Sequence, residues 1–300
     1  MSKLKPWLSA FRLRTLPLSV SGIIIGTCFA FYSGNYNTAI FVLAILTTVA
    51  LQILSNLAND YGDGVKGTDN NERQGPERAI QSGSITPAQM LEAIKVNILI
   101  VIVLSLLLIY MSFGQGNLLY SLLFIVLAGL SIYAAINYTM GSKAYGYRGL
   151  GDVFVFIFFG LVSVMGSYFL YANKIDHNVV LPSISLGLLS VGVLNLNNMR
   201  DIDSDILSNK ITLAVKLGKQ RSKTYHLALI FGAILVSLVF TILYYTSPLN
   251  FLFFVAYIPL IIHAKKISKA KTASDFDSQL KVLALTTFLF SVLLGVGYIL

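Results

Sequence analysis

The chain has 300 residues, of which 56% are hydrophobic and only 12% are charged, and its mean hydropathy is +0.75. Soluble domains carry a charge on roughly a quarter of their residues, so this composition excludes a soluble globular protein. The net charge of +9 does not require a nucleic-acid partner, because anionic lipid headgroups attract basic residues at the ends of membrane helices. We therefore expect a protein that contacts membrane lipid and no nucleic acid.

Apolar runs recur along the whole chain. They lie at about 17–33, 38–58, 94–112, 118–138, 152–172, 180–199, 226–246, 249–264 and 281–300. Each run is near the length that a helix needs to cross about 30 Å of hydrocarbon. Pro182 and Pro259 are expected to interrupt the sixth and eighth runs. The prediction is an all-α integral membrane protein with about nine transmembrane helices.

The basic residues are distributed unevenly between the loops. Of the 22 lysines and arginines, all but Lys174 precede the first run or follow an even-numbered run. Cytoplasmic loops collect lysine and arginine, whereas translocated loops avoid them. The distribution therefore predicts a cytoplasmic N-terminus, a C-terminus outside, and basic loops that face the cytoplasm.

Most acidic residues fall in two short segments. Asp60, Asp63, Asp69, Glu72 and Glu77 follow the second run, and Asp201, Asp203 and Asp205 follow the sixth. Ionisable groups near a membrane interior are costly and usually mark a function. The two segments are therefore the leading candidates for a functional site.

The two acidic segments share a spacing. If the second helix continues to Asp63, then Asn56, Asn59 or Asp60, and Asp63 lie on one helix face, and the same argument puts Asn197, Asp201 and Asp205 on one face. Each segment has an asparagine four residues before an aspartate pair. We interpret the chain as one membrane domain, 1–300, with pseudo-repeated halves of about 1–140 and 141–300.

Carboxylates held this close repel one another unless a cation lies between them. Hard oxygen ligands suit Mg²⁺ shared with a phosphate substrate, and a diphosphate fits this requirement. The cations expected to bind the diphosphate are Lys66, Arg73, Arg78, Arg200 and Lys210. The alternative is that the acids are solvated loop ends paired with nearby bases, which we expect for Asp203 because it is off the shared face.

No other site class is supported by the sequence. His177, His226 and His263 are scattered along the chain, and Cys28 is the single cysteine, so neither a zinc nor a haem site is suggested.

Several motifs together resemble the UbiA superfamily of intramembrane prenyltransferases. Asn59-Asp60-x-x-Asp63 and Asp201-x-x-x-Asp205 are similar to its paired acidic motifs. The third acid stands at Asp69, where the superfamily usually has one at 67, and this variant resembles the menaquinone branch. Three more stretches resemble the same branch, namely Arg14-Thr15-Leu16-Pro17, Tyr145 to Asp152, and Asn197 to Asp201 continuing to Lys210-x-Thr212-Leu213.

The resemblance implies the 1,4-dihydroxy-2-naphthoate polyprenyltransferase family, whose members prenylate the naphthoate with loss of CO₂ to give demethylmenaquinone. It also implies a bacterial cytoplasmic (inner) membrane location and no obligate protein partner. Residue by residue, Asp60, Asp63, Asp201 and Asp205 match the Mg²⁺-diphosphate aspartates, with Asn56 and Asn197 as helpers. Asn59 is a further candidate for diphosphate binding, and Asp69 is a further metal candidate.

An anionic acceptor requires donors for its carboxylate and hydroxyl groups. The candidates are Lys143, Tyr145, Tyr147, Arg148 and, more remotely, Arg14. Asp152 is expected to orient Arg148 or to help deprotonate the ring hydroxyl. The alternative for the tyrosines and Lys143 is anchoring at headgroup depth, and Arg14 could serve only to keep the N-terminus inside.

A carbocation formed from the prenyl diphosphate would need shielding from water. Phe154, Phe156, Phe158 and Phe159 are candidates for an aromatic wall, although helix packing alone also explains them.

Two other functions remain open at this point. The first is prenylation of another aromatic acceptor such as 4-hydroxybenzoate. The second is a secondary transporter, because paired half-repeats with intramembrane polar residues also occur in transporters. The acids lie at helix ends and not near the bilayer midplane, which favours the prenyltransferase.

Overall fold

The computed structural model describes residues 4–69, 75–114 and 116–300, and all regular elements within these residues are helices. Nine helical spans in the described part of the chain are long and apolar enough to cross a membrane, as predicted. The chain is therefore a multi-pass membrane protein. In chain order the elements are α1 (Leu4–Phe11), η1 (Leu13–Thr15), α2 (Leu16–Tyr32), α3 (Thr38–Val65), α4 (Pro87–Phe113), α5 (Leu118–Asn137), η2 (Tyr145–Arg148), α6 (Gly151–Val155), η3 (Phe156–Gly166), α7 (Ser167–Ala172), η4 (His177–Val179), α8 (Val180–Arg200), α9 (Ile202–Leu207), α10 (Leu213–Leu243), η5 (Pro248–Ala256), α11 (Tyr257–Lys269) and α12 (Ala273–Ile299).

Several helices extend beyond their apolar runs at the end that carries the acidic segments. The second apolar run ends near residue 58, but α3 continues to Val65 and therefore carries Asp63 on its last turns. Likewise α12 begins at Ala273, where Thr272 and Asp275 form a capping box, and not near residue 281. These polar turns are helical because capping side chains satisfy the terminal N–H groups, so hydropathy alone underestimates the helix length.

The two prolines behave differently from each other. Pro182 lies in the first turn of α8, where a missing N–H breaks no helical bond, so the prediction that it interrupts the sixth helix is wrong. The eighth span is indeed divided, because a 3₁₀ segment, η5, precedes α11, in which Pro259 again occupies the first turn.

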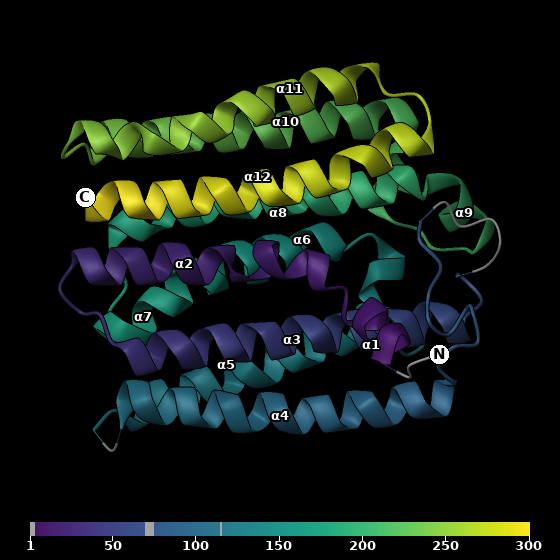
Figure 1. Ribbon diagram of the computed structural model, residues 1–300, viewed down its shortest axis with the longest axis horizontal. Coiled ribbons are helices and arrows are strands. Elements are labelled where there is room, and N and C mark those ends of the chain that lie inside the picture. Colours follow the sequence, from purple (N-terminus) through teal and green to yellow (C-terminus); the bar gives the residue numbers. More distant parts are fainter. Residues whose placement is uncertain (1–3, 70–74, 115) are drawn as a thin grey trace.

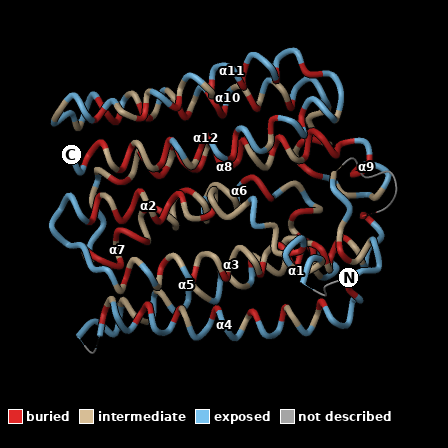
Figure 2. Tube along the Cα trace, in the orientation of Figure 1, coloured by how far each residue is buried: buried red, intermediate tan, exposed pale blue. Residues whose placement is uncertain are grey.

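The helices run side by side, and the two ends of the chain lie at opposite ends of the bundle (Figure 1). At the centre, α8 packs against α10, α12 and η3, while α2 packs against α12 and α3 against α4. Most of α8 is buried, whereas α5 buries only Ala134. Figure 2 shows this pattern, with buried positions concentrated on the central helices and exposed positions on the outer ones. Many of the exposed residues on α4 and α5 are large and apolar. The outer faces are suited to contact lipid.

The fifth span contains an unusual segment. Residues Phe156–Gly166 form η3, a π-helix between α6 and α7, and such segments often occur at functional sites. A Cβ on Gly160 would lie 2.6 Å from the Cα of Gly187, so η3 approaches α8 as closely as two glycines allow. This close approach fixes which side chains of η3 face the interior.

Two histidines meet in the interior. The Nε2 atoms of His226 on α10 and His263 on α11 are 2.8 Å apart, and Nδ1 of His263 lies 3.4 Å from Oε1 of Gln279 on α12. The interpretation of the histidines as scattered is therefore wrong for this pair, because helix packing brings together residues that are 37 positions apart.

Candidate functional site

A cavity of about 740 Å³ opens at the end of the bundle that carries the acidic segments. Among the residues predicted for the site, those that line it are Arg14, Asn56, Asn59, Asp63, Asp69, Arg78, Tyr145, Asn197, Arg200, Asp201, Asp205 and Lys210. Its deeper wall is mainly apolar and includes Leu108, Ile109 and Phe124, which lie near the opposite ends of α4 and α5. The cavity thus joins a charged mouth to a long apolar interior.

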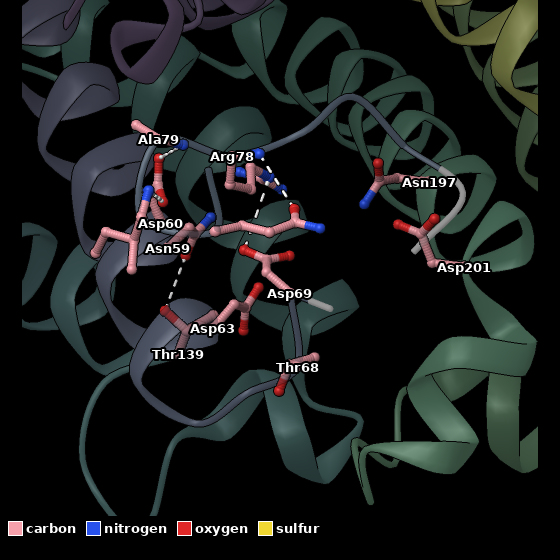
Figure 3. A network of polar contacts seen from close by, with 12 residues as sticks. Asn59, Asp60, Asp63, Thr68, Asp69, Arg78, Ala79, Thr139, Asn197 and Asp201 are labelled. Carbon is pink, nitrogen blue, oxygen red and sulfur yellow. Dashed lines mark hydrogen bonds and ion pairs between the residues drawn. The ribbon is translucent and has the colours of Figure 1, made fainter. Parts of the chain in front are cut away.

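The first acidic motif presents two carboxylates to the mouth (Figure 3). After α3 ends, Gly67 adopts a positive φ of 71°, and the N–H groups of Thr68 and Asp69 donate to the carbonyl of Asp63 at 2.9 and 3.3 Å. This turn brings Asp69 back beside Asp63. Oδ2 of Asp69 lies 3.9 Å from Nε of Arg78, so the shifted third acid belongs to the same cluster.

Asp60 has a different environment from its neighbours. Its Oδ2 accepts the N–H of Ala79 at 3.2 Å, and its Oδ1 accepts the N–H of Ile80 at 3.3 Å. The residue is buried and faces a smaller cavity of about 260 Å³ beside the main one. In this arrangement Asp60 holds the loop that carries Arg78, and its carboxylate does not line the main cavity with Asp63.

The second acidic motif is organised by Arg200. Its Nε and Nη2 donate to the two oxygens of Asp201 at 2.7 and 2.6 Å, its Nη1 donates to Asp277 at 2.7 Å, and its Nη2 also donates to Asn197 at 2.8 Å. A guanidinium with this many partners is a positioning group. Its hydrogen-bonding capacity is largely used within the protein, which argues against the predicted role in diphosphate binding.

Asp277 is a member of the site that the sequence interpretation missed. It lies in the first turns of α12, lines the cavity, and contacts Arg200. The available signal was that Asp277 is one of the few acids outside the two clusters. Asp203, in contrast, is exposed and pairs with Lys219 at 2.7 Å, which confirms the expectation that it is a solvated residue.

Lys210 lies between the two acidic motifs. Its Nζ is 3.3 Å from Oδ2 of Asp63 and 3.8 Å from Oδ1 of Asp205. Burial lowers the pKa of this lysine, but the charges of Asp63 and Asp205 outweigh burial and raise the pKa above its usual value. Lys210 is therefore a largely buried ammonium ion that links the two motifs.

The asparagines before the motifs have structural partners. Nδ2 of Asn56 donates to the carbonyl of Phe11 at 2.9 Å, and Oδ1 of Asn59 accepts from the hydroxyl of Thr139 at 3.3 Å. Both side chains also line the cavity. They join α3 to the first span and to the segment after α5, which fixes the position of the first motif.

Among the predicted phosphate-binding cations, Arg73 lies outside the described residues and Lys66 does not line the cavity. Lys66 is exposed, donates to the carbonyl of Thr139 at 2.6 Å, and lies 4.1 Å from the ring centroid of Tyr147. Burial lowers the pKa of Lys66, an effect that the charge of Asp63 partly offsets. Of Lys66 and Arg78, Arg78 is therefore the one that lines the cavity.

Tyr147 contacts an acidic motif and not the cavity. Its hydroxyl donates to Oδ1 of Asp63 at 2.8 Å and lies within hydrogen-bonding distance of the hydroxyl of Thr68. Burial and the charge of Asp63 raise the pKa of Tyr147, so the phenol remains a neutral donor. The structure therefore does not support its predicted contact with an acceptor and makes it a support for Asp63.

Replacing Tyr147 with phenylalanine tests this support. Loss of a hydrogen bond to a charged group is expected to lower kcat by about tenfold, which corresponds to about 1.4 kcal/mol. Steady-state kinetics with both substrates would measure the effect, and Tyr133→Phe on the exposed face of α5 is the matched control. An unchanged kcat with a raised KM for the aromatic acceptor alone would instead support the original prediction.

Three more residues of the predicted acceptor loop, Lys143, Arg148 and Asp152, lie outside the cavity lining. Lys143 and Arg148 are exposed, and the carbonyl of Arg148 accepts from Nζ of Lys216 at 2.6 Å. Asp152 is buried and accepts from the hydroxyl of Tyr225 at 3.1 Å. The prediction that Asp152 orients Arg148 is wrong, because Asp152 is paired with α10.

Tyr145 is the member of that loop that reaches the cavity. Its hydroxyl donates to the carbonyl of Ala134 at 2.8 Å, and its ring stacks on Phe154 with centroids 3.9 Å apart. Phe158 and Phe159 continue the lining, as predicted. Phe156 does not, because its ring packs at the position where Gly187 lacks a side chain. The aromatic wall therefore contains three of the four predicted phenylalanines.

The mouth carries oxygen ligands that suit a metal ion, but basic side chains already contact several of them. Carboxylate and amide oxygens face it from α3, α8 and α9, and this donor set suits Mg²⁺. Among residues 4–69, 75–114 and 116–300, however, no three acidic, histidine or cysteine side chains converge closely enough to hold an ion alone. Arg200 and Lys210 instead engage the carboxylates of the second motif and Asp63. The residues thus fit a magnesium ion whose remaining ligands come from a bound substrate.

Comparison with known proteins agrees with this architecture. Residues 19–292 match the UbiA prenyltransferase family. The chain is 42% identical to a 1,4-dihydroxy-2-naphthoate octaprenyltransferase of Escherichia coli (strain K12), over 87% of this chain and 84% of that protein. It is 39% identical to the protein of the same name from Haemophilus influenzae, over 98% and 96% of the two chains.

Solved structures show the same fold. A UbiA homolog from Archaeoglobus fulgidus bound to DMAPP and Mg²⁺ superposes with a TM-score of 0.69 over 98% of this chain and 99% of that chain, at 12% identity. The chain combines a helical membrane bundle with two acidic motifs around one cavity mouth, as expected of an intramembrane prenyltransferase. This chain belongs to the UbiA prenyltransferase family.

Proposed function

We propose that the protein transfers a polyprenyl group from polyprenyl diphosphate to 1,4-dihydroxy-2-naphthoate, with loss of diphosphate and CO₂, to give demethylmenaquinone. The observation that carries the proposal is the cavity, in which two acidic motifs at the mouth adjoin a long apolar interior. The bacterial relatives at 42% and 39% identity, both named 1,4-dihydroxy-2-naphthoate octaprenyltransferase, support the choice of acceptor.

Asp63, Asp69, Asp201 and Asp205 are the residues that would hold Mg²⁺. Such an ion would neutralise charge on the diphosphate as it leaves. Arg78 and Lys210 line the same mouth and would bind the phosphate oxygens directly, because both present ammonium or guanidinium donors to it. Charge developing on the leaving group is thus matched by groups already in place.

The apolar interior suits the prenyl chain. On α3 the cavity lining extends from Ala44 to Asp63, which is about 28 Å at about 1.5 Å per residue. An extended isoprene unit spans four carbon–carbon bonds, or about 5 Å, so about five units would fit along this wall. Tyr145, Phe154 and Phe158 would exclude water from the allylic cation and stabilise it through their π faces.

The acceptor would lie beside the arginines near the first helix. Arg12, Arg14 and Arg78 line both the main cavity and the smaller cavity of about 260 Å³ that adjoins it. Guanidinium groups match a carboxylate in geometry and charge, so this side cavity suits the carboxylate of a planar aromatic acid. Prenyl transfer would then occur where the two cavities meet.

Replacing Arg14 with alanine should raise the acceptor KM by about tenfold, the effect of losing one hydrogen bond to a charged group. The KM for the prenyl diphosphate should be nearly unchanged. Arg148→Ala is the control, because that residue is exposed and lies outside the cavity lining, and its kinetics should be normal. An unchanged acceptor KM in folded Arg14→Ala would contradict this contact and would indicate that Arg14 only sets the topology.

We further place the protein in the bacterial cytoplasmic (inner) membrane, with the acidic end in the cytoplasm. The basic residues support this orientation, because all but Lys174 fall in the loops expected on that side. Both substrates would then reach the mouth from the cytoplasmic face or from the inner leaflet.

An acceptor panel tests the proposed function. Purified protein in detergent would receive a polyprenyl diphosphate and Mg²⁺ with either 1,4-dihydroxy-2-naphthoate or 4-hydroxybenzoate, and prenylated products would be identified by mass spectrometry. Metal-dependent product from the naphthoate supports the proposal. Product from 4-hydroxybenzoate alone would keep the reaction class but change the acceptor, and no product from either acceptor would reject prenyl transfer.

A further inference from the structure

Lys210 occupies the position where the two acidic motifs approach each other. Asp63 comes from the end of α3 and Asp205 from α9, and the lysine Nζ lies 3.3 and 3.8 Å from their carboxylates. The backbone N–H of Lys210 donates to the carbonyl of Asp205 at 2.8 Å, which holds the start of its side chain in place. Its side chain is only 12% exposed.

The surroundings explain why a cation is needed at this point. Asp63 is 5% and Asp205 4% exposed, and two buried carboxylates facing one mouth are unfavourable without a positive charge nearby. Asp201 is already compensated by Arg200, which contacts both of its oxygens. Lys210 contacts both Asp63 and Asp205.

The position of Lys210 also conflicts with metal binding. Within the described parts of the chain no three candidate ligands converge to hold an ion alone, and the ammonium group lies against the carboxylates that would have to bind one. A divalent cation arriving by itself must therefore displace a well-placed charge. A cation arriving with a diphosphate brings new anionic partners for that charge.

We propose that Lys210 is an internal counter-ion that excludes divalent cations from Asp63 and Asp205 until a diphosphate is present, and then turns to the phosphate oxygens. This inference rests on the proposed function, because it concerns the same diphosphate site. Lysine suits the role, since a compact charge on a flexible four-carbon stem can move between partners. Metal and diphosphate then bind together, and the site does not fill with metal alone.

The proposal predicts effects of opposite sign for one substitution. In Lys210→Met, metal binding without diphosphate becomes tighter because the competitor is gone, while turnover falls because a phosphate ligand is lost. A residue that only binds phosphate would leave the affinity for metal alone unchanged. A residue that only holds the fold would not tighten the binding of any ligand.

The test is Mn²⁺ binding to purified protein in detergent, followed by electron paramagnetic resonance, with and without inorganic diphosphate. Lys210→Met should bind Mn²⁺ alone at least about tenfold more tightly than the natural protein, comparable to the effect of one opposite charge on the proton affinity of a carboxylate. Lys210→Arg, which keeps the charge, should remain weak, and so should the control Lys219→Met, because Lys219 is exposed and pairs with Asp203.

Unchanged or weaker Mn²⁺ binding in folded Lys210→Met would overturn the proposal. If that variant does not fold, Lys210→Gln provides the same comparison. A Mn²⁺ affinity of Lys210→Gln equal to that of the natural protein would also overturn the proposal. The measurement with diphosphate distinguishes a failure of the proposed function from a failure of the counter-ion proposal. If the natural protein does not bind Mn²⁺ even with diphosphate, the proposed function fails as well, whereas normal joint binding with no gain in the variants rejects the counter-ion alone.

Discussion

Replacing Arg200 with methionine is expected to lower the free energy of unfolding by about 3–5 kcal/mol. The guanidinium is buried and is shared by Asp201, Asp277 and Asn197, so its removal leaves the buried carboxylate of Asp201 without its cation. Methionine has a similar length, and the loss therefore reports mainly the charge and not a cavity. Chemical or thermal unfolding in detergent, followed by circular dichroism, would measure the difference.

The stability lost in Arg200→Met should depend on the charge of Asp201, the partner that remains. Adding Asp201→Asn to Arg200→Met should recover part of the lost stability, because a neutral amide is cheaper to bury than an unpaired carboxylate. Lys219→Met is the matched control, since its ion pair with Asp203 is exposed and should contribute at most about 1 kcal/mol. Equal stability of Arg200→Met and the natural protein would show that Asp201 does not depend on Arg200.

Replacing Asp63 with asparagine should reduce kcat/KM by about a hundredfold to a thousandfold, the range measured when one group that stabilises developing charge is removed. Asp63 is central to the site, because it accepts from Tyr147 and Lys210 and lines the mouth. The variant keeps the shape of the side chain and removes its charge. Single-turnover assays at saturating Mg²⁺ would measure the loss.

Asp203→Asn is the control for this substitution. It removes the same charge from the same end of the molecule, but Asp203 is exposed and outside the cavity lining, so activity should be nearly unchanged. Similar losses in both variants would indicate a general effect of charge on the loops and would argue against a special role for Asp63.

The composition and spacing of the sequence predict the fold well for a physical reason. A lipid environment allows few spanning structures, so apolar runs of the required length define the helices with little ambiguity. The length of the apolar runs does not, however, predict the polar ends of the helices. The last turns of α3 and the first turns of α12 are helical because of capping and tertiary contacts, which hydropathy does not detect.

The candidate site is predicted less completely. The acidic motifs are recognisable because acids are rare in such a chain, and four of the predicted polar side chains at the mouth come from α3 and α8, namely Asn56, Asn59, Asp63 and Asn197, with Asp201 directly after α8. The position of a side chain on a helix face, however, does not reveal its hydrogen-bond partners. Asp60 is on the helix face of the first motif, but a backbone turn at Ala79 captures its carboxylate.

Long-range contacts account for the remaining differences. Tyr147 and Asp152 both lie in the segment predicted to bind the acceptor. In the structure, however, Tyr147 donates to Asp63, and Asp152 accepts from Tyr225. Asp277 joins the site because α12 packs against α8, which no local pattern indicates. Such contacts depend on how helices distant in sequence pack, and a single sequence does not specify that packing.

The most direct test of the account is a structure of the protein with Mn²⁺ and an unreactive prenyl thiodiphosphate, in which the metal is located by anomalous scattering. We expect metal between Asp63 and Asp205, phosphate oxygens beside Arg78 and Lys210, and a prenyl chain along the apolar wall of α3. A diphosphate bound at one acidic motif alone, or a prenyl chain outside the cavity, would contradict the claim that the two motifs form one site.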